Sequence, residues 1–329
     1  LCTIVLDGRP VNSCLVFAVE ADGAVIETGT RETPEPGRLS DLQQAFVDFG
    51  AVQCGFCTPG MLASARALLQ RHPRPTREQI VEALAGNYCR CTGYEPIVNA
   101  VEAVAKGTYV PKPAPAAPYV GGEANRVDGA AKVTGAATFV HDMFLPGMLH
   151  GRILVSPHAS ARIRRVDVSK ARAMPGVRAV LTGEDVPYKL GLYMEDKDIL
   201  ARGVVRHQGE AVAAVAAETW IQAKLATLAI EVEYEPLEPV LDVHQALADG
   251  APQVHPGLAG YSWMKGVFFP RPGHNVAHHQ KIRKGDTAKG MAGADRVFEF
   301  RFTNPPVQHA PMETHAAIVT ARPDGEVEI

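Results

Sequence analysis

The side chains in this sequence that are best suited to chemistry are its six cysteines, all within the first 91 residues. Four of them form two close pairs, Cys54-Gly-Phe-Cys57 and Cys89-Arg-Cys91. Thiolates grouped this closely usually hold a soft metal centre. Disulfides are a weaker interpretation, because Cys-x-Cys and Cys-x-x-Cys pairs suit a metal better than a secreted framework. The spacing of these four inner cysteines therefore predicts an iron–sulfur site, with structural zinc as the alternative.

Cys2 and Cys14, the two outer cysteines, are separated by a predicted hairpin. Residues 3–6 are apolar and β-branched, Asp7-Gly8 is a turn signal, and residues 14–19 form a second apolar run. Plant-type [2Fe–2S] domains use C-x4-C-x2-C and a distant fourth cysteine. If Cys2 is the third ligand and Cys14 the fourth, the first two ligands precede Leu1. Buried structural thiols are the alternative interpretation of this pair.

Four predicted helices between residues 39 and 105 should position the inner cysteines. Capping boxes or an early proline mark their starts, at Ser40/Gln43, Thr58-Pro59, Thr76/Gln79 and Pro96. We expect the Thr58 hydroxyl to be an N-cap. Cys57-Thr58 and Cys91-Thr92 both precede a helix, so the ligands would lie at helix N-termini. Free N–H groups and the positive end of the helix dipole stabilise anionic sulfur there.

The same helices should bury one apolar face around a shared core. The residues predicted to face that core include Phe46, Phe49, Met61, Ile80, Val81 and Leu84.

Residues 108–122 form a proline- and alanine-rich spacer, which is the clearest predicted domain boundary. Beyond it the pattern is mixed α/β. Strands are predicted at 148–155, 177–181, 211–216, 228–234, 296–302 and 316–320, and helices at 169–174, 219–229 and 244–247. Arg162, Arg164 and Arg165 are interpreted as a solvated charge run, and Glu210 as the cap of a buried strand end.

The composition is ordinary for a multidomain globular protein, with 46% hydrophobic and 21% charged residues among 329. A formal net charge of −3 gives no attraction to nucleic acid or to an anionic membrane surface. No run of 18 apolar residues could span a bilayer. The sequence begins and ends within strand-like runs and lacks an initiator methionine. We therefore expect an internal piece of a longer, cytoplasmic protein, with any export signal upstream of Leu1.

Residues 52–61 (Val-Gln-Cys-Gly-Phe-Cys-Thr-Pro-Gly-Met) and 86–94 (Gly-Asn-Tyr-Cys-Arg-Cys-Thr-Gly-Tyr) carry the inner cysteines. Both closely resemble the [2Fe–2S] motifs of the xanthine oxidase family of molybdenum hydroxylases. Residues 2–14 resemble the second half of that family's plant-type cluster loop. Further motifs resemble the opening of its molybdopterin-binding subunit, at residues 126–135, 145–150, 156–159, 209–213 and 308–315.

This resemblance implies an α+β multidomain fold. Its parts would be a remnant of a β-grasp, ferredoxin-like [2Fe–2S] domain at 1–30, a four-helix [2Fe–2S] bundle at 31–107, the linker at 108–122, an α/β hammerhead-type domain at 123–243 and the start of a molybdopterin-binding domain at 244–329.

The resemblance also implies an oxidoreductase that acts on aldehydes or heteroaromatic carbons at molybdenum and passes electrons out through two [2Fe–2S] clusters. The inner cysteines would hold the cluster nearer to molybdenum, and the outer cysteines would hold part of the other. Gln53 and the backbone at Cys91 match positions that touch the pterin. We expect no catalytic residue in this chain and no turnover by the chain alone, because the family's catalytic motifs lie beyond it.

No flavin domain lies between the helical bundle and the molybdopterin-type region, so the arrangement resembles flavin-free aldehyde oxidoreductases and no FAD is expected in this chain. The expected partners are the remainder of the molybdopterin subunit and a separate flavoprotein subunit or soluble electron carrier; a homodimer is compatible with this arrangement. Two alternatives stay open. One is a reductive enzyme similar to hydroxybenzoyl-CoA reductases, and the other is a zinc-stabilised module that binds a partner protein.

Overall fold

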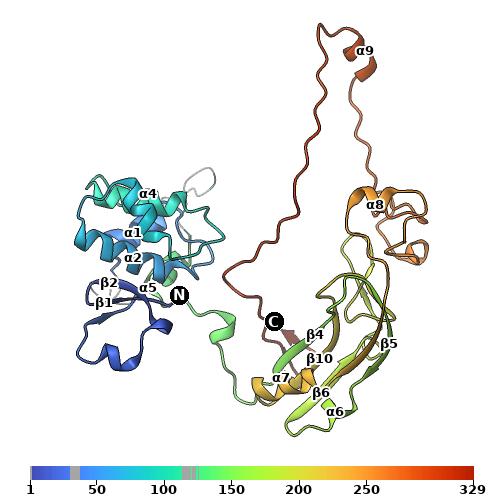
Figure 1. The fold of residues 1–329 in the computed structure, drawn as a ribbon, viewed down its shortest axis with the longest axis horizontal. Coiled ribbons are helices and arrows are strands. Elements are labelled where there is room, and N and C mark those ends of the chain that lie inside the picture. Colours follow the sequence, from blue (N-terminus) through green and yellow to red (C-terminus); the bar gives the residue numbers. More distant parts are fainter. Residues whose placement is uncertain (1, 30–37, 113–119, 121–123, 125) are drawn as a thin grey trace. The chain divides into compact units, whose positions relative to one another are not determined.

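The computed structural model describes residues 2–29, 38–112, 120, 124 and 126–329. The chain divides into two compact units, one formed by Leu1–Met143 with Arg301–Ile329 and the other by Phe144–Phe300. Figure 1 shows the helices and strands, coloured from blue at the N-terminus to red at the C-terminus. Most of the predicted linker at 108–122 lies outside the described residues.

The first unit opens with a small antiparallel sheet of strand order β2-β1-β3. Its strands are β1 (Thr3–Leu6), β2 (Arg9–Asn12) and β3 (Ile26–Glu27). Asp7 and Gly8 join β1 to β2 with φ angles of 47° and 77°, the left-handed conformation that a two-residue hairpin turn requires. The predicted turn is confirmed.

The predicted second strand at residues 14–19 is wrong. The return strand starts at Arg9, directly after the turn, and its register with β1 ends at Asn12. After Asn12 the chain forms two 3-10 helices, η1 (Ser13–Leu15) and η2 (Ala18–Ala21).

Four helices of the first unit follow: α1 (Asp41–Asp48), α2 (Thr58–Arg71), α3 (Arg77–Leu84) and α4 (Glu95–Ala105). Both predicted capping boxes are confirmed. The hydroxyl groups of Ser40 and Thr76 each accept a hydrogen bond from the N–H three residues later, and their own N–H groups donate to the side-chain oxygen of the glutamine at that position. At α2 the prediction is wrong by one residue. Cys57 is the N-cap and already has helical backbone angles, so Thr58 is the first helical residue.

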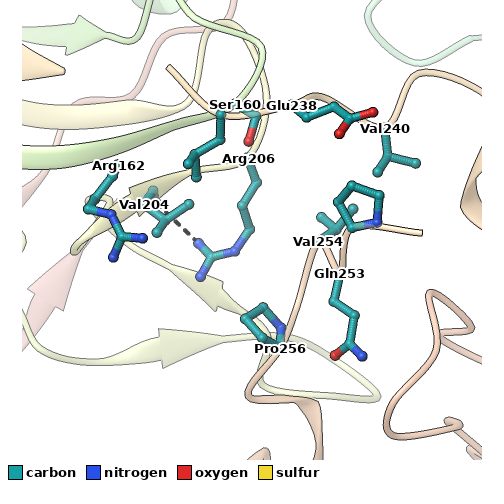
Figure 2. Close-up of a pocket in the computed structure, with 11 residues that line it drawn as sticks. Ser160, Arg162, Val204, Arg206, Glu238, Val240, Gln253, Val254 and Pro256 are labelled. Carbon is teal, nitrogen blue, oxygen red and sulfur yellow. Dashed lines mark hydrogen bonds between the residues drawn. The ribbon is translucent and has the colours of Figure 1, made fainter. Parts of the chain in front are cut away.

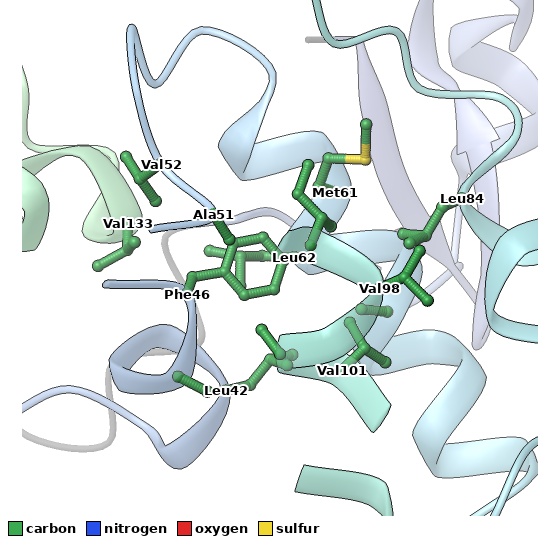
Figure 3. Close-up of a cluster of buried hydrophobic side chains, with 14 of the residues drawn as sticks. Leu42, Phe46, Ala51, Val52, Met61, Leu62, Leu84, Val98, Val101 and Val133 are labelled. Carbon is green, nitrogen blue, oxygen red and sulfur yellow. The ribbon is translucent and has the colours of Figure 1, made fainter. Parts of the chain in front are cut away.

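The helices share one apolar core, which Figure 3 shows in close-up. Phe46, Met61 and Ile97 are fully buried in it. Burial of each such side chain stabilises the fold by roughly 1.5–3 kcal/mol. Val133, from the short helix α5 (Gly129–Thr134), belongs to the same core.

Two predicted core residues lie at the surface instead. Phe49 is 40% exposed because it is the C-terminal cap of α1, beyond the helix's buried face. Val81 is 52% exposed, whereas its neighbour Ile80 is fully buried. Successive helical side chains point about 100° apart, so an apolar pair places only one member against the core.

The second unit contains two three-stranded antiparallel sheets, with strand orders β4-β10-β6 and β11-β5-β9. The strands are β4 (His150–Val155), β5 (Ala161–Asp167), β6 (Val177–Thr182), β9 (Val204–Val205), β10 (Ala211–Ala217) and β11 (Glu231–Pro236). The helices are α6 (Ser169–Arg172), α7 (Trp220–Leu228) and α8 (Val243–Leu247). α7 contacts β4 and β10. The strands and helices predicted between residues 148 and 247 are confirmed, with boundaries shifted by a few residues.

Sequence reasoning misses β5, because three arginines hide its alternation. In the structure β5 is the central strand of its sheet, and Ala161 at its start is fully buried. Arg162 and Arg164 both pair with Glu235 on the neighbouring strand β11. The three arginines are solvent-exposed, as interpreted, and two of them also form cross-strand ion pairs.

A cavity of about 360 Å³ lies in the second unit (Figure 2). The charged residues of its lining are Arg162, Arg206 and Glu238. The backbone N–H of Arg206 donates to the carboxylate of Glu210, which is buried directly before β10, as predicted for a strand-end cap. No cysteine or histidine lines this cavity, so it is not a second thiol site.

The predicted strands at 296–302 and 316–320 are wrong, apart from Thr320. Phe298 and Phe300 are 71% and 73% exposed. An alternating pattern forms a strand only where a neighbour supplies hydrogen-bonding partners, and the described residues supply none here. The ladder that does form pairs β12 (Thr320–Ala321) with β13 (Val327–Glu328).

The remaining described elements are β7 (Lys189–Leu190), β8 (Lys197–Asp198), α9 (Thr287–Ala292), η4 (Val140–Asp142) and η5 (Leu258–Gly260). None of the described helices combines the length and the hydropathy that a bilayer crossing needs.

Candidate metal centre

The four inner cysteines meet in two pairs in the first unit. The Sγ atoms of Cys54 and Cys91 lie 3.6 Å apart. The thiols of Cys57 and Cys89 share a hydrogen bond and are both buried. Cys54 and Cys91 are partly exposed, so one pair faces the protein interior and the other lies nearer to the surface. The predicted grouping of these residues is therefore present in the fold.

A tight turn places the first two cysteines. Gly55 has a φ of +86°, which favours glycine, and its carbonyl accepts a hydrogen bond from the N–H of Thr58 at 3.2 Å. Cys57 then caps α2, and its carbonyl accepts from the N–H of Met61 at 3.0 Å. The first turn of α2 thus starts at a candidate ligand, as the spacing predicts.

A second loop places Cys89 and Cys91 before α4. The N–H of Cys89 donates to Oη of Tyr94 at 3.0 Å, and its Sγ lies 3.2 Å from Oγ1 of Thr92. The N–H of Tyr94 donates to Oγ1 of Thr92 at 3.1 Å. Tyr94 is the N-cap of α4 and has a φ of +67°. Cys91 lies four residues before Glu95, so its link to the helix start runs through this hydrogen-bonded turn.

Arg90, between the two candidate ligands of that loop, contacts a segment far away in the sequence. Its guanidinium donates to the backbone carbonyl of Gln308 at 2.7 Å and also to that of His309. Both acceptors belong to the same compact unit as the cysteines.

The two members of the Cys57–Cys89 pair differ in the pKa of their thiols. The hydrogen bond from Cys57 raises the pKa of Cys57, together with its burial, and lowers the pKa of Cys89 to about 5. Burial, followed by the contact with Cys54, raises the pKa of Cys91. Within the Cys57–Cys89 pair, Cys89 therefore loses its proton more readily than Cys57. Metal ligation needs all four in the thiolate form, so binding would release protons.

The donor set fits a two-iron cluster better than a single ion. Among the residues that the structure describes, no group of three or more His, Cys, Asp or Glu side chains could hold one metal ion. Mononuclear zinc needs four ligands around one centre, whereas each iron of a [2Fe–2S] cluster takes two thiolates. The hydroxyl of Thr58 is buried beside Cys57 and acts to lower the pKa of that thiol, so it is placed as a donor to anionic sulfur.

The outer cysteines lie at the N-terminal hairpin. Cys2 directly precedes β1 and Cys14 is in η1, and both side chains are exposed. The N–H of Ser13 donates to the carbonyl of Cys2 at 2.8 Å, which joins the two ends of the hairpin. Their role as cluster ligands stays a prediction.

Gln53 directly precedes the first inner cysteine and is exposed. Its carbonyl accepts a hydrogen bond from Nζ of Lys132 at 2.9 Å. Its predicted contact with the pterin, like that of Cys91, stays a prediction. Sequence reasoning missed Lys132, although the motif at 126–135 contains it, because the contact crosses the linker.

Sequence models of three domain families match the chain. The [2Fe-2S] binding domain matches residues 27–102, the a/b hammerhead domain of aldehyde oxidase and xanthine dehydrogenase matches 134–238, and the molybdopterin cofactor-binding domain matches 268–329. The chain belongs to the xanthine oxidase family of molybdenum hydroxylases.

Individual members of this family resemble the chain to different extents. Aldehyde oxidoreductase of Megalodesulfovibrio gigas is 33% identical over all of this chain and 37% of its own length. The nicotine 6-hydroxylase small subunit of Paenarthrobacter nicotinovorans is 54% identical over 100 residues, which are 30% of this chain and 59% of that subunit.

A solved structure of the aldehyde oxidoreductase from Desulfovibrio gigas gives a TM-score of 0.66 at 33% identity, covering 78% of this chain and 31% of that one. The mixed α/β multidomain fold is therefore shared with family members of known structure. The chain spans less than two fifths of the curated relative that it matches along its whole length.

Proposed function

We propose that this chain is the electron-transfer region and the opening of the molybdopterin-binding region of a molybdenum-dependent oxidoreductase. The observation that carries the proposal is the meeting of the inner cysteines in two thiol pairs, Cys54 with Cys91 and Cys57 with Cys89. Membership of the family and the matches to a [2Fe-2S] binding domain and a molybdopterin cofactor-binding domain support it.

In this proposal the inner cysteines hold one [2Fe–2S] cluster, with two thiolates on each iron. When bound, such a cluster takes up and releases one electron at a time. The protein's own part is to fix the thiolates and exclude water. Cys57 and Cys89 are only 7% and 8% exposed, and backbone N–H groups of Cys91 and Thr92 lower the pKa of the Cys89 thiol.

The finer assignments belong to the same proposal. Cys2 and Cys14 supply two ligands of a second, outer cluster. Gln53 and the backbone at Cys91 contact the pterin, so that electrons leave molybdenum through the inner cluster. An aldehyde or heteroaromatic compound is the substrate, and a flavoprotein subunit or soluble carrier is the acceptor. The name of one relative, aldehyde oxidoreductase, supports the first substrate class.

The proposal is tested by Cys54→Ser and Cys91→Ser in the complete enzyme. We expect either change to remove the inner cluster's visible absorption and to stop substrate-dependent reduction of the acceptor, because the electron path is cut. Cys14→Ser is the matched control, since it should leave the inner cluster's spectrum intact. Normal turnover with the acceptor in Cys54→Ser would show that the electron path does not run through these thiols.

A further inference from the structure

The segment that follows the linker packs into the core of the cysteine-bearing unit. Val133 of α5 is fully buried, and Figure 3 shows it beside Val52, at the start of the loop that leads to Cys54. The carbonyl of Val133 accepts a hydrogen bond from Nε2 of Gln43, which is also fully buried, at 3.2 Å. An apolar contact and a buried polar contact together fix α5 against α1.

Lys132, the residue before that anchor, lies over the first ligand loop. Its Nζ donates to the carbonyl of Gln53 at 2.9 Å, and this carbonyl belongs to the peptide bond that joins Gln53 to Cys54. Its stem covers Gly55 so closely that a Cβ on this glycine would lie 2.7 Å from Cγ and Cδ of Lys132. Because Gly55 also has a φ of +86°, glycine suits both the turn and the lysine that covers it.

The charge that faces the loop is positive. Lys132 pairs with Asp128 at 2.8 Å, and Arg126 pairs with the same carboxylate, so two cations share one anion. The side chain of Lys132 is only 11% exposed, whereas that of Asp128 is 49% exposed. The better-buried charge is therefore the ammonium group, and solvent screens it less than it screens the carboxylate.

We propose that Lys132 is a positioning residue for the Cys54 loop and a fixed cation that raises the reduction potential of the cluster held by the inner cysteines. This rests on the proposed function, which assigns the cluster to those thiols. One-electron reduction makes the cluster more negative, so a cation held nearby favours the reduced form. The segment after the linker thereby tunes the electron-transfer site that precedes the linker.

The test is a redox titration of the full chain, purified anaerobically, with the reduced cluster followed by EPR and the iron and sulfide content measured for each variant. In Lys132→Gln we expect a more negative midpoint potential, with reduction roughly three- to tenfold less favourable; a tenfold change corresponds to 59 mV for one electron. Lys132→Arg keeps the charge and should stay near the wild type. In Asp128→Asn the shift should be positive, because the cation loses its counter-charge.

Opposite shifts in Lys132→Gln and Asp128→Asn support the proposal, since a general loosening of α5 would move both in the same direction. Unchanged potentials at full cluster content, or shifts of the same sign, overturn it. If Lys132→Gln does not bind a cluster, the midpoint potential of Asp128→Asn alone tests the proposal, and an unchanged potential in that variant overturns it. A wild-type chain that binds no cluster instead overturns the proposed function, and the role of Lys132 with it.

Discussion

At the scale of single residues, the site depends on contacts that only partly follow from sequence spacing. Two Cys pairs at short spacing predict a shared metal site, and the fold does bring Cys54 to Cys91. The hydroxyl groups of Thr92 and Tyr94 that hold the second loop, and the ammonium of Lys132 over the first, could not be predicted. Each depends on backbone turns or on packing across the linker, which local patterns do not encode.

Tyr109 offers a pH-dependent test at this scale. Its Oη donates to the buried carboxylate of Asp48 at 2.7 Å. Burial, followed by that carboxylate, raises the pKa of Tyr109 above its ordinary value of 10.0. A tyrosine with a raised folded-state pKa stabilises the fold below the unfolded-state pKa, and this contribution is lost as pH rises above about 10.

We therefore expect Tyr109→Phe to lower the free energy of unfolding by about 1.5–3 kcal/mol at neutral pH, the usual worth of a hydrogen bond to a charged group. It should also flatten the loss of stability above about pH 10. Urea unfolding of the full chain over a pH series measures both effects. Tyr188→Phe, at a side chain that is 68% exposed, is the control. An alkaline slope that Tyr109→Phe leaves unchanged would contradict this assignment.

At the scale of secondary structure, the sequence predicts best where a local signal is complete. The capping boxes at Ser40 and Thr76 contain both partners within four residues, and both form. The strands predicted at 14–19 and 296–302 fail for the opposite reason. A strand needs a distant partner, and an apolar run does not show whether that partner exists among the residues present.

Helix α3 gives the sharpest element-scale prediction, because Ile80 and Val81 are adjacent and equally apolar in sequence. Ile80 is fully buried and Val81 is 52% exposed. Ile80→Ala should lower the free energy of unfolding by about 2–5 kcal/mol, since it opens a cavity in the core. Val81→Ala should change it by no more than about 0.5 kcal/mol. Equal effects of the two changes in chemical denaturation would show that α3 buries a different face.

At the scale of the whole molecule, the chain joins a cysteine-bearing unit to segments that match the hammerhead and molybdopterin cofactor-binding domain models. The mixed α/β multidomain fold could be foreseen from motif order because each motif is local, whereas α5 crosses the expected boundary. α5 follows the linker in sequence but packs in the core of the cysteine-bearing unit, since Val133 completes that core. Connection by sequence and membership of a packed unit are different properties, and only the structure distinguishes them.

The most direct test of the central claim is the metal content of the anaerobically purified chain, measured together with EPR of the dithionite-reduced protein. We expect at least two irons and two acid-labile sulfides per chain, and a [2Fe–2S] signal that Cys54→Ser removes. A colourless chain that holds one zinc ion and gives no such signal would contradict the assignment of an iron–sulfur cluster to the inner cysteines.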